Sequence, residues 1–134
     1  DPKRIYLTGL SRGGHGTWGL GSRIANRFAA IAPIAGAQHG VQSYESLATL
    51  PIWVAHNPDD GSVDYQGTVK AVAEIEKISG GKFYQSNRVA EADWKNHDFI
   101  LTSGNNPRKS HDAWTEMYDS VEFYRWLLRF KRND

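Results

Sequence analysis

Short continuous apolar runs alternate along this chain with segments whose apolar residues recur at helical spacing. The continuous runs cover residues 4–9, 29–37 and 51–56, and each predicts a buried strand. Helical spacing is found over residues 13–28, 62–79 and 119–128. Strands that alternate with helices form βαβ units. The pattern therefore predicts an α/β fold, a three-layer αβα arrangement around a short, mostly parallel sheet, in a single domain spanning residues 1–134.

Small and polar residues mark the ends of the predicted helices. Ser62 is a candidate N-cap for the second helix, which Gly80 and Gly81 would terminate. Asp119 and Glu122 have the spacing of a capping box at the start of the last helix.

Five glycines lie between residues 13 and 21, inside the first predicted helix. Each would destabilise that helix by about 1 kcal/mol relative to alanine. Their presence predicts that the helix packs closely against the sheet.

The fourth strand is ambiguous, because residues 82–85 and 99–102 are both suitable. We favour residues 99–102, since their distance to His111 suits a loop at the end of a strand. The polar residues 87–98 would then form an excursion between the two stretches.

Composition and charge limit the classes of function. The chain has 134 residues, of which 40% are hydrophobic, enough for the core of one folded domain. The formal net charge is only +1 and the basic residues are scattered, so neither nucleic acid nor an anionic membrane surface is indicated as a partner. There is no cysteine, no apolar run of about 20 residues and no pattern resembling a signal peptide, and the compartment stays undetermined.

One motif points to chemistry. Residues 9–13 read Gly-Leu-Ser-Arg-Gly between a predicted strand and a predicted helix. A nucleophile elbow needs this context, because glycines allow the sharp turn that exposes the serine. The alternative is an ordinary turn, since glycine and serine are common in loops. The context favours Ser11 as a nucleophile.

A serine nucleophile needs a carboxylate to orient its base, and Asp60 is the leading candidate. It lies in the loop after the third predicted strand, where such groups gather in a parallel sheet. Asp59 and Asp64 are alternatives, and all three aspartates could instead be ordinary loop or helix-start residues.

The base should follow the last strand, and His111 does so. The chain order Ser11, Asp60, His111 is the one this type of elbow uses. His97 is the nearby rival, and His111 could instead cap a helix or face water.

Other aromatic residues are weaker candidates. His15, one turn after the elbow, and Trp114, three residues after His111, could contact substrate, although packing or surface roles are favoured for both. A packing or surface role is likewise favoured for His39, and His56 is expected to be a hydrogen-bonded structural residue. No ligand spacing typical of zinc occurs, so we expect neither a metal nor an organic cofactor.

Four ordered blocks carry a resemblance to a known family: residues 4–14, residues 28–34, residues 51–54 with Asp60, and residues 111–114. Together they resemble the α/β-hydrolase superfamily, and within it bacterial carboxylesterases of the dienelactone hydrolase, phospholipase/carboxylesterase and feruloyl esterase-like groups. The resemblance implies Ser11 as nucleophile, Asp60 as acid, His111 as base and the backbone N–H of Arg12 as one oxyanion donor.

The chain departs from that superfamily in one respect. Several strands and a second oxyanion donor normally precede the elbow, whereas only ten residues precede Ser11 here. The chain therefore resembles the C-terminal half of a hydrolase domain, with an open strand edge at residues 4–9. We expect a missing N-terminal segment, self-association through this edge, or a minimal hydrolase whose rate is lowered about a hundred- to a thousandfold by the lost donor.

The predicted function is hydrolysis of a small-molecule carboxylic ester through a Ser-His-Asp triad and an acyl-enzyme. The alternatives are a non-catalytic half-domain used for binding or assembly, and a serine peptidase with the same triad.

Overall fold

The protein is built around a five-stranded parallel sheet. The computed structural model describes residues 1–104 and 110–133. The strands lie in the order β1-β2-β3-β5-β4, and every pairing is parallel. Their bounds are β1 (Tyr6–Leu10), β2 (Ala30–Ile34), β3 (Ile52–Ala55), β4 (Tyr84–Ser86) and β5 (Phe99–Thr102). The predicted α/β fold is confirmed.

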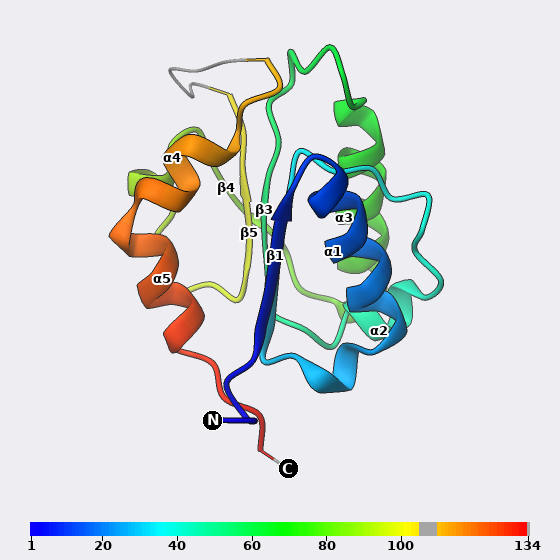
Figure 1. Cartoon of the computed structure of the whole chain (residues 1–134), viewed down its shortest axis with the longest axis vertical. Helices are drawn as coiled ribbons and strands as arrows, with labels where there is room; N and C mark the ends of the chain where they lie inside the picture. Colours follow the sequence, from blue (N-terminus) through cyan, green and yellow to red (C-terminus); the bar gives the residue numbers. More distant parts are fainter. Residues whose placement is uncertain (105–109, 134) are drawn as a thin grey trace.

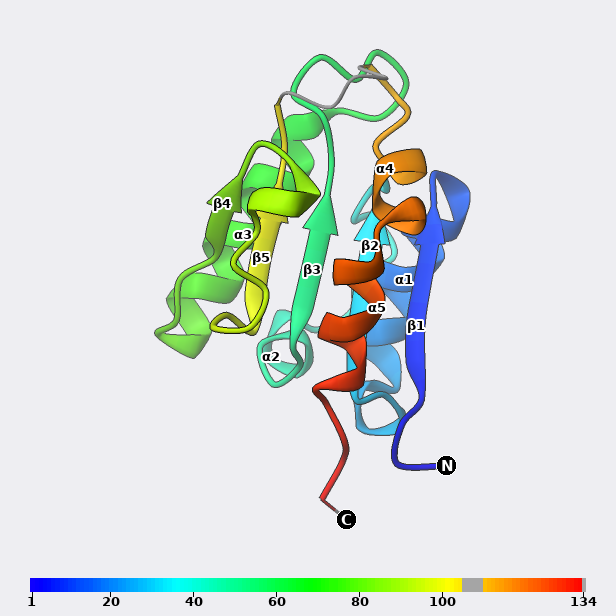
Figure 2. The same ribbon diagram turned by 90° about the vertical axis from the view of Figure 1, so that its left-hand side faces the viewer.

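Helices cover both faces of this sheet (Figure 1). One face carries α1 (Arg12–Arg23), α2 (Tyr44–Leu47) and α3 (Tyr65–Ser79), and the other carries α4 (Trp114–Asp119) and α5 (Val121–Leu128). In Figure 2, α4 and α5 lie in front of the sheet, on the face toward the viewer. Two short 3₁₀ turns, Ala25–Arg27 and Val89–Glu91, complete the described elements. None of the described helices is long and apolar enough to cross a bilayer.

Successive residues of β3 supply the two cores that hold these layers together. Trp53 packs edge-to-face on Phe123 and Trp126 of α5, with ring centroids 5.9 and 5.5 Å away. Ile52 and Val54 belong to the cluster on the other face, under α1 and α3. Neighbouring side chains of a strand point to opposite faces, so one apolar run serves both layers.

Glycines bring α1 against the sheet, as the sequence predicts. A Cβ on Gly14 would lie 2.5 Å from the Ile34 carbonyl oxygen, and one on Gly21 would lie 3.0 Å from the Ile31 side chain. Only a residue without a side chain permits this approach at Gly14.

Both candidates for the fourth strand form strands. Residues 99–102 form β5 beside β3, and residues 84–86 form the outer strand β4. Treating the two stretches as alternatives was wrong, because β4 takes the sheet edge that β5 leaves free.

Two predicted helix ends are also wrong. The first helix ends at Arg23 and gives way to a 3₁₀ turn, rather than continuing to residue 28. Asp64, not Ser62, caps α3 by accepting a hydrogen bond from the Gln66 N–H. The Ser62 N–H donates to the Asp60 carboxylate instead. The predicted end of α3 is confirmed, since Gly80 is its left-handed cap with φ of 77°.

The expected capping box at residues 119–122 does not form. Asp119 is the last residue of α4, and Ser120 separates it from α5 without a side-chain cap. The helix predicted over residues 119–128 corresponds to α5, which begins at Val121 with Ser120 at its N-cap, so Asp119 lies one position before the cap.

Strand β1 lies at an edge of the sheet and pairs with β2 among the described residues. Ile5 and Leu10 expose 44% and 37% of their surface there. Side chains of β1 and of the segment before it are hydrogen-bonded to the C-terminal segment. Tyr6 Oη donates to the Phe130 carbonyl and Arg4 donates to the Leu128 carbonyl, each at 2.8 Å. Pairing of this edge with a further segment or a second copy stays a prediction.

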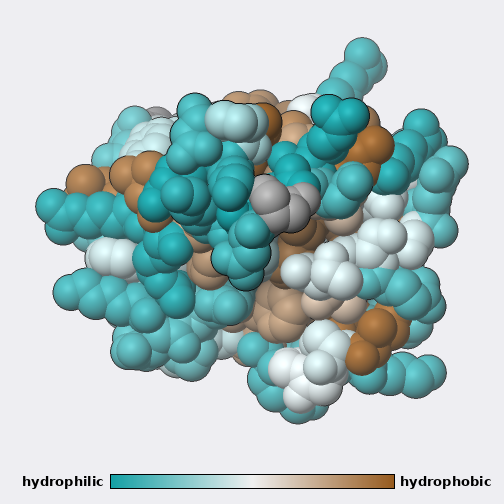
Figure 3. Space-filling view, turned by 90° about the horizontal axis from the view of Figure 1, so that it is seen from below, coloured by the Kyte–Doolittle hydropathy of each residue, from teal (hydrophilic) through white to brown (hydrophobic). Residues whose placement is uncertain are grey.

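The two ends of the molecule differ in character. The end that carries both termini is largely hydrophilic, with smaller apolar patches (Figure 3). At the opposite end the carboxyl ends of the parallel strands come together (Figure 1). Loops at that end carry the predicted site residues, as expected for a parallel sheet.

Candidate active site

Ser11 occupies a sharp turn between β1 and α1. Its φ is 55° and its ψ is −116°, a conformation that residues with a side chain rarely adopt. The Ser11 N–H donates to the Ile34 carbonyl at 2.9 Å, which fixes the turn against β2. A Cβ on Gly9 would overlap the Gly13 carbonyl, so the first glycine of the motif lets the chain reverse direction. The motif thus produces the predicted strand-turn-helix.

Asp60 lies in the loop between β3 and α3, and its side chain is fully buried. The N–H groups of Ser62 and Val63 donate to its Oδ1 at 2.8 and 2.9 Å. Burial alone would raise the pKa of this carboxyl. Hydrogen bonds from Val63, His111 and Ser62 outweigh that effect and lower the pKa of Asp60 below its ordinary value, so the group is a carboxylate at neutral pH.

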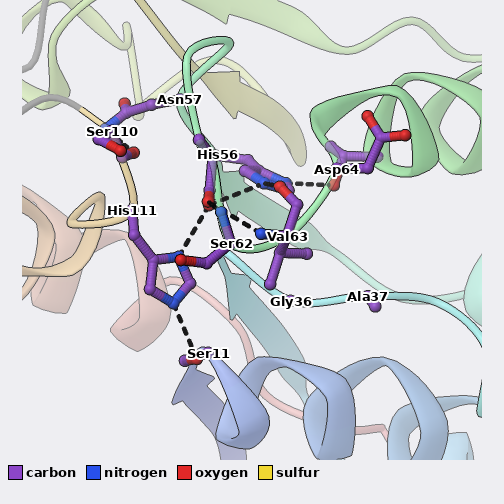
Figure 4. A network of polar contacts seen from close by, with 12 residues as sticks. Ser11, Gly36, Ala37, His56, Asn57, Ser62, Val63, Asp64, Ser110 and His111 are labelled. Atoms are coloured by element: carbon purple, nitrogen blue, oxygen red, sulfur yellow. Dashed lines mark hydrogen bonds and ion pairs between the residues drawn. The ribbon is translucent and has the colours of Figure 1, made fainter.

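His111 lies between Ser11 and Asp60. Figure 4 shows the His111 ring pointing toward Ser11. Its Nδ1 is 2.8 Å from Asp60 Oδ2, and its Nε2 is 2.9 Å from Ser11 Oγ. A carboxylate only accepts, so the proton of a neutral ring belongs on Nδ1. Nε2 then accepts from the Ser11 hydroxyl. The three residues selected from the sequence form one hydrogen-bonded line.

The rival residues lie elsewhere. Asp59 accepts from the Ser110 N–H at 2.9 Å, and Asp64 caps α3. His97 lies 3.2 Å from Asp93 and stacks on Tyr84. These contacts stabilise loops and the start of α3.

Arg12 begins α1 directly after Ser11. The first N–H groups of a helix have no partner within the helix, and they give its start a positive potential. The Arg12 N–H is one of these groups. Its role as an oxyanion donor stays a prediction.

Two residues predicted to contact substrate have different surroundings. The Trp114 ring packs edge-to-face on His111, with centroids 5.1 Å apart. His15 Nδ1 accepts from the Ala37 N–H at 2.9 Å, and its ring contacts His39 at 5.1 Å. His15 also lines an open cavity of about 330 Å³ along α1, together with Gly16, Gly19, Leu20, Arg23 and Gly40. Substrate contact stays a prediction for both residues.

His56, at the end of β3, has a larger part in the site than the sequence indicated. It is hydrogen-bonded and buried as expected, but one of its neighbours is the carboxylate itself, with Nε2 3.2 Å from Asp60 Oδ2. Burial lowers the pKa of His56, although the Val63 carbonyl and Asp60 oppose the shift. A signal for this contact was its position four residues before Asp60.

Asn57 links two loops of the site, and sequence reasoning missed it. Its Nδ2 donates to the Ser110 and Asp112 carbonyls at 3.0 and 3.4 Å, on either side of His111. An amide after a strand is too common for its sequence position to predict this role. Over residues 1–104 and 110–133, no three His, Asp or Glu side chains gather as metal ligands would.

The chain is similar to esterases. It is 39% identical over 66 residues to the bifunctional acetylxylan esterase/xylanase XynS20E of Neocallimastix patriciarum, a match that covers 49% of this chain and 10% of that protein. The crystal structure of a thermostable esterase superposes on 98% of this chain with a TM-score of 0.77 and 29% identity. That of esterase PE8 superposes on 92% with a TM-score of 0.60 and 17% identity, which supports the fold alone. No protein-family model matches the chain.

These similarities confirm the predicted resemblance to α/β-hydrolase esterases. The chain spans a tenth of the length of XynS20E, 32% of the thermostable esterase and 50% of esterase PE8. It therefore corresponds to a part of each of these proteins.

Proposed function

We propose that this chain hydrolyses carboxylic esters, with Ser11 as nucleophile, His111 as general base and Asp60 as the carboxylate that orients the base. The observation that carries the proposal is the line of two hydrogen bonds, 2.9 Å from Ser11 Oγ to His111 Nε2 and 2.8 Å from His111 Nδ1 to Asp60 Oδ2. Similarity to esterases in both sequence and structure supports the choice of an ester as substrate.

In the first half of the reaction, Ser11 Oγ attacks the ester carbonyl carbon while its proton passes to His111 Nε2. The imidazolium is stabilised by Asp60, which keeps its negative charge. The carbonyl oxygen becomes an oxyanion near the start of α1, where the Arg12 N–H and the helix dipole favour negative charge. Collapse breaks the bond to the alcohol oxygen, which takes the proton from Nε2 and leaves an acyl group on Ser11.

The second half repeats these steps with water. His111 Nε2 takes a proton from water as its oxygen attacks the acyl carbon. The second tetrahedral intermediate then collapses, the bond to Ser11 Oγ breaks, and the serine oxygen recovers the proton. The carboxylic acid leaves and the free site is restored.

The name of XynS20E suggests the substrate class to test first. That protein is called an acetylxylan esterase, so acetyl esters of a polysaccharide are the leading candidates, with p-nitrophenyl acetate as a simple reporter. Trp114, against the edge of His111, would lie beside the acyl or alcohol group.

The decisive test compares the chain with its Ser11→Ala variant on p-nitrophenyl acetate and acetylated xylan, and labels both with a fluorophosphonate followed by peptide mapping. We expect hydrolysis and labelling at Ser11 in the first protein and neither in the variant. Ser79→Ala, at an exposed position at the end of α3, is the matched control and should behave like the unsubstituted chain. Equal rates in all three proteins would support a non-catalytic binding module instead, and cleavage of an amide substrate would indicate a peptidase.

A further inference from the structure

Every polar atom of the His56 ring has a partner in the interior. Nε2 lies 3.0 Å from the Val63 carbonyl oxygen and 3.2 Å from Asp60 Oδ2, and Nδ1 lies 2.7 Å from Thr68 Oγ1. His56 and Thr68 are both 0% exposed. Figure 4 shows His56 on the far side of the loop from His111. The ring therefore connects the carboxylate with helix α3.

These partners fix where the ring carries its proton. Both neighbours of Nε2 are acceptors only, so Nε2 must hold the hydrogen. Thr68 Oγ1 then donates to Nδ1. The same Thr68 oxygen accepts a hydrogen bond from Gln38 Nε2 at 2.9 Å. Burial, which lowers the pKa of His56, favours the same neutral form.

We propose that His56, held by Thr68, is a positioning residue that sets the Asp60 carboxylate toward His111; this inference rests on the proposed function. Asp60 Oδ2 lies 2.8 Å from His111 Nδ1 on the side of the site and 3.2 Å from His56 Nε2 on the side of the interior. The His56 hydrogen is directed to the Val63 carbonyl at 3.0 Å, with Oδ2 beside it. Oδ1 receives the two N–H groups of its own loop. Three hydrogen bonds and the contact with His56 thus hold a fully buried carboxylate in one orientation.

The hydrogen-bonded chain continues beyond Thr68 to Gly36, which packs against helix α1. Gln38 Nε2 donates to the Gly36 carbonyl at 3.0 Å as well as to Thr68. Gly36 lies against Gly14 of α1 so closely that a Cβ on either would overlap the other's backbone. Gly67 leaves room for Gln38, because its Cβ would lie 2.5 Å from Oε1. The loop that carries Asp60 and the turn that carries Ser11 are therefore linked through the side chains of Thr68 and Gln38.

The titratable groups that face His56 come from three segments. They are Asp60 of its own loop, His111 of the segment before α4, and Tyr65 of α3, whose ring is 5.5 Å away. The neutral N–H of His56 beside Oδ2 favours one orientation of the carboxylate. Without it, Asp60 would hold the His111 ring less firmly and would stabilise the imidazolium formed during the reaction less.

Four variants test this inference. Thr68→Val has nearly the same shape and removes the hydroxyl, whereas Thr68→Ser keeps it. His56→Leu removes the donor to Asp60, whereas His56→Gln places an amide N–H near the position of Nε2. We expect kcat for p-nitrophenyl acetate, per fluorophosphonate-titrated site, to fall about tenfold or more in Thr68→Val and His56→Leu with KM within about twofold. Thr68→Ser and His56→Gln should retain most of kcat.

Two further measurements separate positioning from mere stability. The acid limb of kcat/KM should move to lower pH in His56→Leu and, less, in Thr68→Val, because a less well oriented Asp60 stabilises the imidazolium less. In NMR spectra, the resonance of the hydrogen-bonded His111 Nδ1 proton should shift or broaden in the same two variants and stay unchanged in Thr68→Ser. A variant that only loses stability would lower the unfolding temperature without moving either signal.

The outcomes distinguish the two proposals. Wild-type kcat, acid limb and His111 resonance in folded Thr68→Val and His56→Leu alike would overturn the positioning role. If Thr68→Val does keep all three but His56→Leu does not fold, the positioning role also fails, because Thr68 would not be needed. Hydrolysis that Ser11→Ala leaves intact would overturn the proposed function instead, and the NMR comparison would still decide whether His56 positions Asp60.

Discussion

Ser11 Oγ lies 2.9 Å from His111 Nε2, although 100 positions separate the two residues in the chain. The contact joins the start of α1, on one face of the sheet, to the segment before α4, on the other. Parallel strands bring both segments to the same end of the molecule. A proton would pass from the serine to the histidine through this contact, and several predictions depend on it.

Replacing the proposed base should abolish most of the activity. In His111→Ala we expect kcat to fall by at least about a thousandfold, because Ser11 loses the group that accepts its proton. Hydrolysis of p-nitrophenyl acetate measures this. His97→Ala is the matched control, since His97 pairs with Asp93 away from the site, and it should keep nearly full activity. Equal losses in both variants would argue against His111 as the base.

Replacing the proposed acid by its amide should be almost as damaging. Asp60→Asn could donate to His111 Nδ1 and so favour the wrong tautomer, for which we expect a loss of about 10⁴ in kcat. The measurement is kcat in samples whose folding is verified by circular dichroism. Asp64→Asn should be nearly neutral, because asparagine also caps a helix such as α3. A fully active Asp60→Asn would remove Asp60 from the mechanism.

Stability should fall as the solution is acidified. The pKa of His56 is lowered from 6.5 by burial, so below that pH the unfolded chain binds a proton that the folded chain does not. The free energy of unfolding therefore decreases as pH falls from about 6.5. The lowered pKa of Asp60 adds a further loss below about 3.8, where the unfolded chain again binds more protons.

Urea unfolding between pH 4 and pH 8 can follow the contribution of His56. We expect a shallower decline in His56→Gln than in the unsubstituted chain, because the other histidines contribute equally to both. Identical slopes would show that His56 titrates alike in the folded and unfolded chain.

Two glycines of α1 should respond oppositely to alanine. Gly14→Ala would place a Cβ 2.5 Å from the Ile34 carbonyl oxygen and force the helix from the sheet, so we expect a loss of about 1–3 kcal/mol in the free energy of unfolding. Gly16 is exposed with no atom within 4 Å of a Cβ, and Gly16→Ala should gain about 0.5–1 kcal/mol. Thermal unfolding measures both. A stable Gly14→Ala would contradict the close packing found here.

The fold was predictable wherever the signal was local. The apolar runs over residues 4–9, 29–37 and 51–56 overlap β1, β2 and β3, because a buried parallel strand needs a continuous apolar segment. Strand β4 has only three residues, with one buried side chain, and its pairing with β5 defines it. A segment so short carries too little pattern to be separated from a loop.

The sequence by itself determined the sharp turn at Ser11 and the order of serine, aspartate and histidine, because glycine spacing and strand ends are local properties of the chain. Only the tertiary structure decided that Asp60, rather than Asp59 or Asp64, accepts the hydrogen bond of the His111 ring, and that His56 contacts the same carboxylate. Adjacent carboxylates are alike in sequence. They differ in the direction their side chains take, which depends on how the loop packs between β3, α3 and the segment carrying His111.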